Sequence, residues 1–315
     1  MPAYSASAPG KVILFGEHAV VYGRPAIAVP VLQVRAKAIV SMDPRSAPGV
    51  VRLQAPDIGL ETTLADLPEN HPLAAVLLKA ASAMKLSHIP ACTIKIISNI
   101  PIAGGMGSGA AVSVAILRAF SASLGHPLSD EQVSEISYEV EGIHHGTPSG
   151  IDNTVITYAA PVYFVKGRKI ETLRVKRTFT IVVGDTGIQS HTSSVVSDVH
   201  KAWGADPDQF EGLFDAVGAI AIAARKSIET GSIDALGPLM NENQAQLCKM
   251  GVSSPELDKL IEAARTSGAL GAKLSGAGRG GNMIALVTPE GASKVATAIE
   301  HAGAVRTIVT EIHKT

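Results

Sequence analysis

The sequence is poor in cysteine and in net charge, and both shortages exclude classes of protein. Its 315 residues include two cysteines, Cys92 and Cys248, far apart and with no Cys or His at ligand spacing beside them. We expect each to be a small buried apolar residue rather than a metal ligand. With 27 Lys+Arg against 28 Asp+Glu, the formal net charge is −1. This balance argues against binding to nucleic acid or to an anionic membrane through a basic surface.

Long apolar runs are also missing. No stretch of about 18 apolar residues occurs, and Met1 leads into polar and small residues instead of a basic region followed by an apolar run. We therefore predict a cytoplasmic protein without a membrane partner. Aromatic residues make up only 4% while glycine reaches 30, so the core must be built from Ala, Val, Ile and Leu, and tight turns should be common. These features suit an enzyme of mixed α and β structure.

Hydrophobic periodicity predicts an α+β chain. Strands are expected at residues 12–15, 26–29, 34–40, 93–97, 160–165, 180–183, 282–287 and 305–312, and helices at 71–84, 110–124, 130–144, 209–230, 233–250, 256–266 and 292–301. The length suggests two domains. The charged run 166–177, with an expected hairpin turn at Gly167 and Arg168, is the candidate boundary. We divide the chain into residues 1–172 and 173–315.

A glycine-rich segment, Pro101-Ile-Ala-Gly-Gly-Met-Gly-Ser-Gly-Ala-Ala111, lies between a predicted strand and a predicted helix. Free N–H groups at a helix N-terminus favour phosphate, so this loop is a candidate anion cradle. A Walker loop is excluded because the Gly-Lys-Ser/Thr ending is absent. Residues 105–110 match the looser dinucleotide fingerprint, which keeps a Rossmann oxidoreductase as the rival class. That fold requires an acidic residue after a second strand, where residues 126–132 predict a loop and a helix start.

Two further segments combine glycines with charged side chains. Lys11, Glu17 and His18 flank a short apolar strand near the N-terminus, and polar groups at both ends of one strand suggest a site. A second glycine-rich loop, Gly271-Ala-Lys-Leu-Ser-Gly-Ala-Gly-Arg-Gly-Gly281, precedes the strand predicted from Asn282. Two such loops in one chain favour a phosphate-rich ligand.

A carboxylate pair occurs in the segment Glu141-Gly-Ile-His-His-Gly-Thr-Pro-Ser-Gly-Ile-Asp-Asn153. Asp152 follows a turn of small residues, where a carboxylate can approach a substrate hydroxyl closely and accept its proton. The neighbouring His144 and His145 do not predict a metal site, because adjacent helix positions point in different directions and no third soft ligand is near.

Taken together, these four segments resemble the GHMP kinase superfamily, in order from about Pro9 to Val287. Within it, Lys-Val-Ile-Leu-Phe-Gly-Glu-His-Ala-Val-Val-Tyr-Gly is similar to the opening signature of mevalonate kinases. The resemblance implies an ATP:alcohol phosphotransferase that uses Mg²⁺ and phosphorylates the 5-hydroxyl of (R)-mevalonate. It also implies a two-domain α+β fold, with an N-terminal half like domain 2 of ribosomal protein S5 and a ferredoxin-like C-terminal half. Dimers are common in the superfamily, so a homodimer is compatible with it.

The same resemblance implies a role for individual residues. Asp152 would be the general base, and Lys11 would lie beside it and offset charge on the transferred phosphate. Glu141 and Ser108 would hold Mg²⁺. The ATP phosphates would be bound by Pro101, Ile102, Ala103, Gly104, Gly105, Met106, Gly107, Ser108, Gly109, Ala110 and Ala111. The substrate pocket would be lined by Glu17, His18, Thr192, Gly276 and Ala277.

One residue departs from the family pattern. The family usually has Ser-Ser-Ala in the phosphate loop and binds the metal through the second Ser, whereas Gly109 stands there in this chain. Ser108 or a water would take its place, since Mg²⁺ readily keeps waters. Two alternatives remain: a GHMP kinase for phosphomevalonate, homoserine or a sugar, and an ATP-binding regulatory module that releases no ADP in response to an alcohol.

Overall fold

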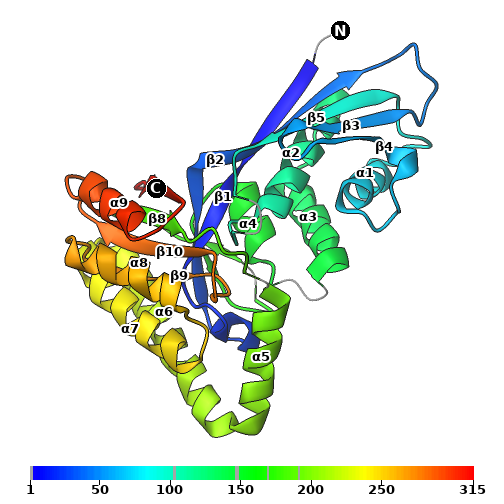
Figure 1. Cartoon of the computed structure of the whole chain (residues 1–315). Helices are drawn as coiled ribbons and strands as arrows, with labels where there is room; N and C mark the ends of the chain where they lie inside the picture. Colours follow the sequence, from blue (N-terminus) through cyan, green and yellow to red (C-terminus); the bar gives the residue numbers. More distant parts are fainter. Residues whose placement is uncertain (1–2, 102–103, 146–148, 169, 191) are drawn as a thin grey trace. The chain divides into compact units, whose positions relative to one another are not determined.

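The computed structural model describes residues 3–101, 104–145, 149–168, 170–190 and 192–315 (Figure 1). The chain packs as two compact units, each assembled from separate stretches of sequence. Unit 1 contains Met1–Gly10, Val34–Ile100 and Gly107–Ala159, and unit 2 contains Lys11–Gln33, Pro101–Met106 and Ala160–Thr315. The predicted boundary between residues 172 and 173 lies inside unit 2, and a division there stays a prediction.

Unit 1 combines strands with a group of packed helices. Its strands include β3 (Val51–Ala55), β4 (Leu60–Thr63) and β5 (Cys92–Ser98), and its helices are α1 (Pro72–Ala83), α2 (Ser108–Ser123), α3 (Asp130–His145) and α4 (Ile151–Tyr158). β3 pairs in parallel with β5 and antiparallel with β4. The helices α2, α3 and α4 pack on one another, and α2 also contacts β5. Small residues in α2, such as Ala111 and Ala115, are fully buried and permit this close packing.

Two long strands run through both units. β1 (Ala3–Phe15) pairs with β2 (Ala26–Met42), and β2 pairs with β6 (Val162–Phe164) near its start and with β5 near its end. The prediction of separate strands at 26–29 and 34–40 is therefore wrong. Pro30, which lacks an N–H, is tolerated because it falls between the two stretches of β2 that pair with β6 and β5.

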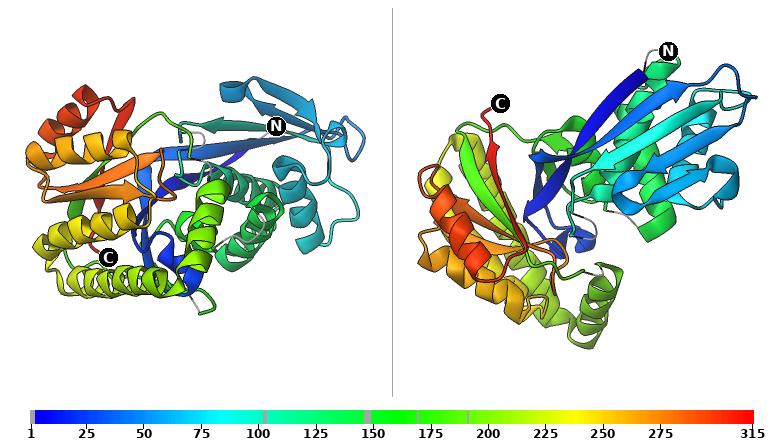
Figure 2. Two further views of the ribbon diagram at one scale, coloured as in Figure 1. Left: turned by 60° about the horizontal axis from the view of Figure 1, so that its bottom comes forward. Right: turned by 45° about the horizontal axis from the view of Figure 1, so that its top comes forward.

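Unit 2 contains an antiparallel sheet in the order β11-β8-β10-β9. Its strands are β8 (Phe179–Asp185), β9 (Gly271–Ser275), β10 (Asn282–Val287) and β11 (Arg306–Ile312), and its helices are α5 (Thr192–Ala205), α6 (Pro207–Thr230), α7 (Leu236–Lys249), α8 (Pro255–Thr266) and α9 (Ala292–His301). α8 and α9 pack side by side against this sheet (Figure 2). The short β7 (Glu171–Thr172) pairs with β6 across the turn at Gly167 and Arg168, which confirms the predicted hairpin.

Helix α7 covers the outer edge of β9. The side-chain oxygens of Asn241 and Gln244 accept hydrogen bonds from the backbone N–H groups of Ala272 (3.1 Å) and Leu274 (2.9 Å). These two amides replace the neighbouring strand that an edge strand lacks. Helices α7 and α8 both pack on β9, which explains why the strand is buried along its whole length although it lies at the edge of the sheet.

Several sequence predictions need correction. Residues 271–275, which the glycine content predicts to open a loop, form the buried strand β9. Helices α4 and α5 were not predicted, and the helix expected from residue 233 begins at Leu236, after a 3₁₀ turn at Ile233–Ala235. Cys92 is buried as expected, whereas Cys248 lies exposed on the outer side of α7. Along the described ranges, no helix has both the length and the apolar character that crossing a membrane requires.

Candidate functional site

The N-terminus of α2 carries the second half of the predicted phosphate loop in unit 1. Gly107 precedes the helix with a φ of 72°, and in the described part of the chain no side chain caps the first turn. A Cβ added at Gly109 would meet nothing within 4 Å. First-turn N–H groups without a capping side chain can bind an anion. Ser108, Gly109, Ala110 and Ala111 therefore lie where a phosphate-binding helix start was expected.

Asp152 lies in the first turn of α4, where it is half-buried. The helix is fixed to α3 by Asn153, whose buried amide donates to the backbone and hydroxyl oxygens of Ser134 at 3.1 and 2.9 Å. Glu141 is half-buried near the end of α3. Asp152, Glu141 and Ser108 thus come from three helices that pack on one another within unit 1.

The oxygen donors of unit 1 fit the chemistry of Mg²⁺. Within the described ranges, no group of three or more His, Cys, Asp or Glu side chains could hold a metal by itself. Mg²⁺ does not require such a cage, because it keeps several waters and binds one or two carboxylates together with substrate phosphates. Glu141 supplies a carboxylate and Ser108 a hydroxyl, so both residues are suitable ligands for a nucleotide-bound Mg²⁺.

The first half of the phosphate loop belongs to unit 2, together with Lys11. The Lys11 backbone N–H donates to the carbonyl of Met106 at 3.0 Å, and the Lys11 side chain is buried. The predicted base and the predicted lysine therefore belong to different units, Asp152 to unit 1 and Lys11 to unit 2. Ile102 and Ala103 lie outside the described residues.

His18 occupies a strained turn after β1. Its φ is 60° and its ψ is −51°, and the Ala19 N–H donates to the carbonyl of Glu17 at 2.6 Å, which makes a γ-turn of the rare positive-φ type. Nε2 of His18 lies 2.9 Å from the carbonyl oxygen of Ala277, so Nε2 must carry the proton and donate. Burial lowers the pKa of His18 to about 4, and the charge of Arg279 acts in the same direction. The imidazole is therefore neutral at pH 7, with Nδ1 as an acceptor.

Glu17 is paired with Lys273 in the interior of unit 2. Both side chains are at most 1% exposed, and Lys273 Nζ donates to the Glu17 carboxylate and to the carbonyl of Leu274. Burial raises the pKa of Glu17 and lowers that of Lys273, because each charge loses its hydration. Lys273 was not singled out from the sequence, although a lysine between Ala272 and Leu274 in an apolar run was a usable signal. A substrate contact by Glu17 stays a prediction.

The second glycine-rich loop is used mainly for close backbone packing. A Cβ at Gly278 would lie 2.0 Å from the carbonyl oxygen of Val252, and one at Gly280 would lie 2.8 Å from that of Ile188. Gly276, by contrast, would meet nothing within 4 Å. Close backbone packing, and not a ligand, therefore accounts for several of the glycines in this loop.

The second glycine-rich loop is also connected to the start of α5. Ser190 Oγ donates to the carbonyl of Gly278 at 2.6 Å, and the exposed Thr192 begins the helix two residues later. His18, Gly276 and Ala277 lie on the same unit, and the bond from His18 to Ala277 joins the strained turn to this loop. Most residues predicted for the substrate pocket are thus linked within unit 2.

Comparison with known proteins adds to this geometry. Residues 73–160 match the family model for the GHMP kinases N terminal domain, and residues 224–305 match that for the GHMP kinases C terminal. The mevalonate kinase of Thermococcus gammatolerans is 38% identical over 328 aligned positions, which cover 98% of this chain and 96% of that protein. The chain belongs to the GHMP kinase family. The predicted superfamily and the enzyme class of a kinase are thereby confirmed.

Solved structures agree with the fold of this kinase. The L. major mevalonate kinase in complex with R-mevalonate is 30% identical, covers 99% of this chain and 96% of its own, and has a TM-score of 0.84. The Streptococcus pneumoniae phosphomevalonate kinase reaches a TM-score of 0.81 at 16% identity, which shows a shared fold alone. The predicted two-domain α+β GHMP kinase fold is confirmed.

Proposed function

We propose that this kinase transfers the γ-phosphoryl group of ATP to the 5-hydroxyl of (R)-mevalonate, giving 5-phosphomevalonate and ADP. The observation that carries the proposal is the 38% identity to a mevalonate kinase over 98% of the chain. The choice of alcohol is further supported by the R-mevalonate bound to the L. major enzyme, which is 30% identical.

In this proposal the ATP phosphates bind along residues 101–111, where the first turn of α2 supplies N–H donors. Asp152 accepts the proton of the 5-hydroxyl as the oxygen attacks the γ-phosphorus, and ADP leaves from the opposite side. Lys11 offsets the negative charge on the transferred group. Glu141 and Ser108 would hold Mg²⁺, which would supply positive charge to offset the negative charge of the phosphates.

The residues proposed for the alcohol lie in unit 2. His18 presents a neutral Nδ1, which can accept a hydrogen bond from a hydroxyl of the substrate. Thr192 at the start of α5, Gly276 with open space at its Cβ position, and Ala277 would contact the rest of the substrate. Glu17 would line the substrate pocket from its buried position beside Lys273.

The test is ADP release measured with a panel of alcohols: (R)-mevalonate, phosphomevalonate, homoserine and galactose. We expect (R)-mevalonate to give the highest kcat/KM and phosphorus NMR to place the new phosphate on the 5-oxygen. Turnover of phosphomevalonate alone would assign the chain to another GHMP kinase reaction. ATP binding without ADP release for any alcohol would instead favour a regulatory nucleotide-binding module.

A further inference from the structure

Asn282 connects the second glycine-rich loop to the phosphate loop. It is the first residue of β10 and is 2% exposed. Its side-chain Nδ2 donates a hydrogen bond to the carbonyl oxygen of Gly104, and both residues belong to unit 2. The contact is close packed, because a Cβ at Gly104 would lie 3.5 Å from that same Nδ2 and 3.3 Å from the Cβ of Pro101.

We propose that Asn282 is a positioning residue that orients the backbone of the phosphate loop for nucleotide binding. The inference rests on the proposed function in one respect, namely that residues 101–111 bind the ATP phosphates. Asn282 does not touch the nucleotide in this proposal and acts through Gly104.

The hydrogen bond to the Gly104 carbonyl also fixes the direction of the next backbone donor, the Gly105 N–H. The peptide unit is planar and trans, so the Gly104 carbonyl and the Gly105 N–H point in opposite directions. When Asn282 binds the Gly104 carbonyl, the Gly105 N–H is directed away from Asn282. A Cβ at Gly105 would meet nothing within 4 Å, so open space lies beside this residue. Asn282 thereby fixes the direction of a backbone donor in a part of the loop where the Cβ position of Gly105 is not crowded.

A second hydrogen bond of the same kind acts two residues later. The Lys11 N–H binds the carbonyl of Met106 at 3.0 Å, which by the same argument fixes the direction of the Gly107 N–H. Gly105 and Gly107 have φ values of 74° and 72°, so the segment depends on glycine and has little stiffness of its own. Two external donors therefore set the orientation of this part of the loop.

Asn282 is attached to a rigid part of unit 2. β10 is an inner strand that pairs with β8 and β9, and Asn282 lies opposite Asp185 and Ser275. All residues of β10 are buried. The preceding Gly281 is also fixed, since its N–H donates to the Ile188 carbonyl at 2.8 Å and its carbonyl accepts from the Thr186 N–H at 2.9 Å. A side chain on such a frame can hold the peptide unit after Gly104 in one orientation.

The test compares nucleotides that differ in their phosphates. Calorimetric titration of Asn282→Ala should show ATP and ADP binding weakened by about three- to tenfold, the effect of losing one buried hydrogen bond. Adenosine affinity and the KM for the alcohol should stay within about twofold of wild type, since neither depends on the loop N–H groups. Asn282→Asp keeps the shape of the side chain but places an acceptor against the Gly104 carbonyl, so it should weaken ATP binding at least as much. This second variant serves as the test if the alanine variant does not fold.

Asn241→Ala is the matched control. Asn241 also lies in unit 2 and also bonds a backbone group, the Ala272 N–H, but it supports β9 and not the phosphate loop. Its loss should lower the free energy of unfolding and leave ATP affinity unchanged. Unchanged ATP affinity in the folded Asn282 variants, or an equal loss for ATP and adenosine, would overturn the proposal. If the wild-type chain bound no ATP, the proposed function would fail first and this inference with it.

Discussion

Asp152 combines a half-buried carboxylate with a firmly held helix start, because Asn153 ties α4 to α3. We predict that Asp152→Asn keeps the fold and ATP affinity but lowers kcat by roughly 10²- to 10⁴-fold, since an amide cannot accept the proton of the attacking hydroxyl. Steady-state kinetics together with an ATP titration measures both effects.

A matched control for this change is Asp130→Asn. Asp130 also begins a helix of unit 1, but its partner is Arg118 at 2.5 Å and no role in the reaction is predicted for it. We expect its kcat to stay close to that of the wild type. A loss of less than threefold in a correctly folded Asp152→Asn variant would count against Asp152 as the base.

Gly109 has a conformation that other residues can adopt. It lies in the first turn of α2 without a positive φ, and a Cβ there would meet nothing within 4 Å. We predict that Gly109→Ser is tolerated and lowers the Mg²⁺ concentration needed for half-maximal rate, because it adds a hydroxyl ligand. Glu141→Gln should raise that concentration on the order of tenfold or more, as changes at metal sites commonly do.

The measurement for both variants is a Mg²⁺ titration at saturating ATP, with Ser108→Ala as the comparison. An unchanged Mg²⁺ requirement in Glu141→Gln, combined with a raised one in Ser108→Ala, would show that the loop holds the ion and Glu141 does not.

His18 predicts a specific pH dependence of stability. Its pKa is about 4 in the folded chain and 6.5 ordinarily, so the unfolded chain takes up the proton first as the pH falls. This contribution to stability is fully present above about pH 6.5 and is lost as the pH falls toward 4, by about 3 kcal/mol in total. His18→Asn removes the titration and keeps a residue that tolerates positive φ.

Urea denaturation of the wild type and of His18→Asn at several pH values between 4 and 7 provides the measurement. As the pH falls, the unfolding free energy of the wild type should decrease more than that of His18→Asn. If the unfolding free energies of the two proteins changed in parallel with pH, His18 would have the same pKa in the folded and unfolded chains, and the prediction would be wrong.

Residues were predictable where a motif connected them to chemistry. Lys11, Asp152 and the loop glycines stand in runs whose spacing suggested a site, and their roles stay predictions. Lys273 and Asn282 escaped notice because their importance lies in partners far along the chain, Glu17 and Gly104. The apolar run around Lys273 could have indicated its burial, but no local pattern identifies Glu17 as its partner or shows that Asn282 bonds a distant carbonyl.

At the scale of elements, Arg279 joins the second glycine-rich loop to α5. Its guanidinium binds Asp198 at 2.6 Å and the carbonyl of Gly251 at 3.2 Å, and it holds the pKa of Asp198 below its usual range. The backbone of Arg279 has a φ of 54°, which is strained for any residue with a Cβ. The side-chain contacts therefore compensate for an unfavourable backbone.

These two effects can be separated with two substitutions. Arg279→Ala removes the side-chain contacts and keeps the strain, whereas Arg279→Gly removes both. We predict that the glycine variant is more stable than the alanine variant by about 1 kcal/mol. Urea denaturation measures the difference, and hydrogen exchange in α5 should increase in both variants. Equal stability of the two variants would mean that the loop relaxes and that the strain is not retained.

Elements with clear periodicity were predictable and others were not. The helices at α1, α2 and α9 have apolar faces and clear ends, and they were found near their observed bounds. α4 follows Ser149 and Gly150, which predict a turn. β9 is rich in small residues, and its edge is covered by α7, whose Asn241 and Gln244 side chains accept hydrogen bonds from its backbone. Tertiary contacts, which a local pattern does not contain, determine both.

At the scale of the whole molecule, the two units are interleaved along the sequence. β1 passes from unit 1 to unit 2 between Gly10 and Lys11, and β2 passes back between Gln33 and Val34. Charge and glycine content along the sequence predict a single boundary between two continuous domains, and they do not indicate strands that belong to both units. The family resemblance predicted two domains, whereas the path of the chain through the units came only from the structure.

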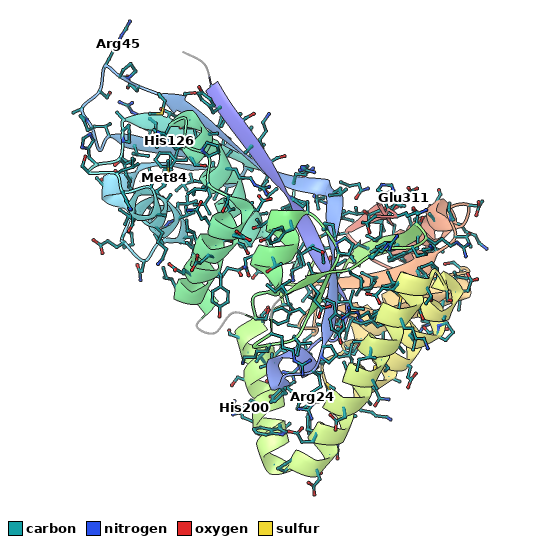
Figure 3. All side chains as sticks on the ribbon, turned by 180° about the vertical axis from the view of Figure 1, so that it is seen from behind. Arg24, Arg45, Met84, His126, His200 and Glu311 are labelled. Atoms are coloured by element: carbon teal, nitrogen blue, oxygen red, sulfur yellow. The ribbon has the colours of Figure 1, made fainter. Side chains whose placement is uncertain are left out.

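Shared strands predict that the two units unfold together. Trp203 is the single tryptophan and reports on unit 2, where it packs on Tyr22 with ring centres 5.5 Å apart. His200 and Arg24, labelled in Figure 3, lie in the same region of unit 2, near α5 and the turn after β1. Far-UV circular dichroism reports on helices of both units. Because β1 and β2 each contribute residues to both units, we expect both signals to follow one urea transition.

A tryptophan in unit 1 makes this expectation sharper. Tyr138 on α3 is 41% exposed, so Tyr138→Trp in a Trp203→Phe background should give a local signal from unit 1 with little disturbance of the core. Coincident midpoints for Trp203 fluorescence in the wild type, for the introduced tryptophan in the double variant and for circular dichroism would show that the units unfold as one cooperative system. Separate midpoints for the two fluorescence signals would show instead that one half of β1 and β2 can melt while the other stays paired.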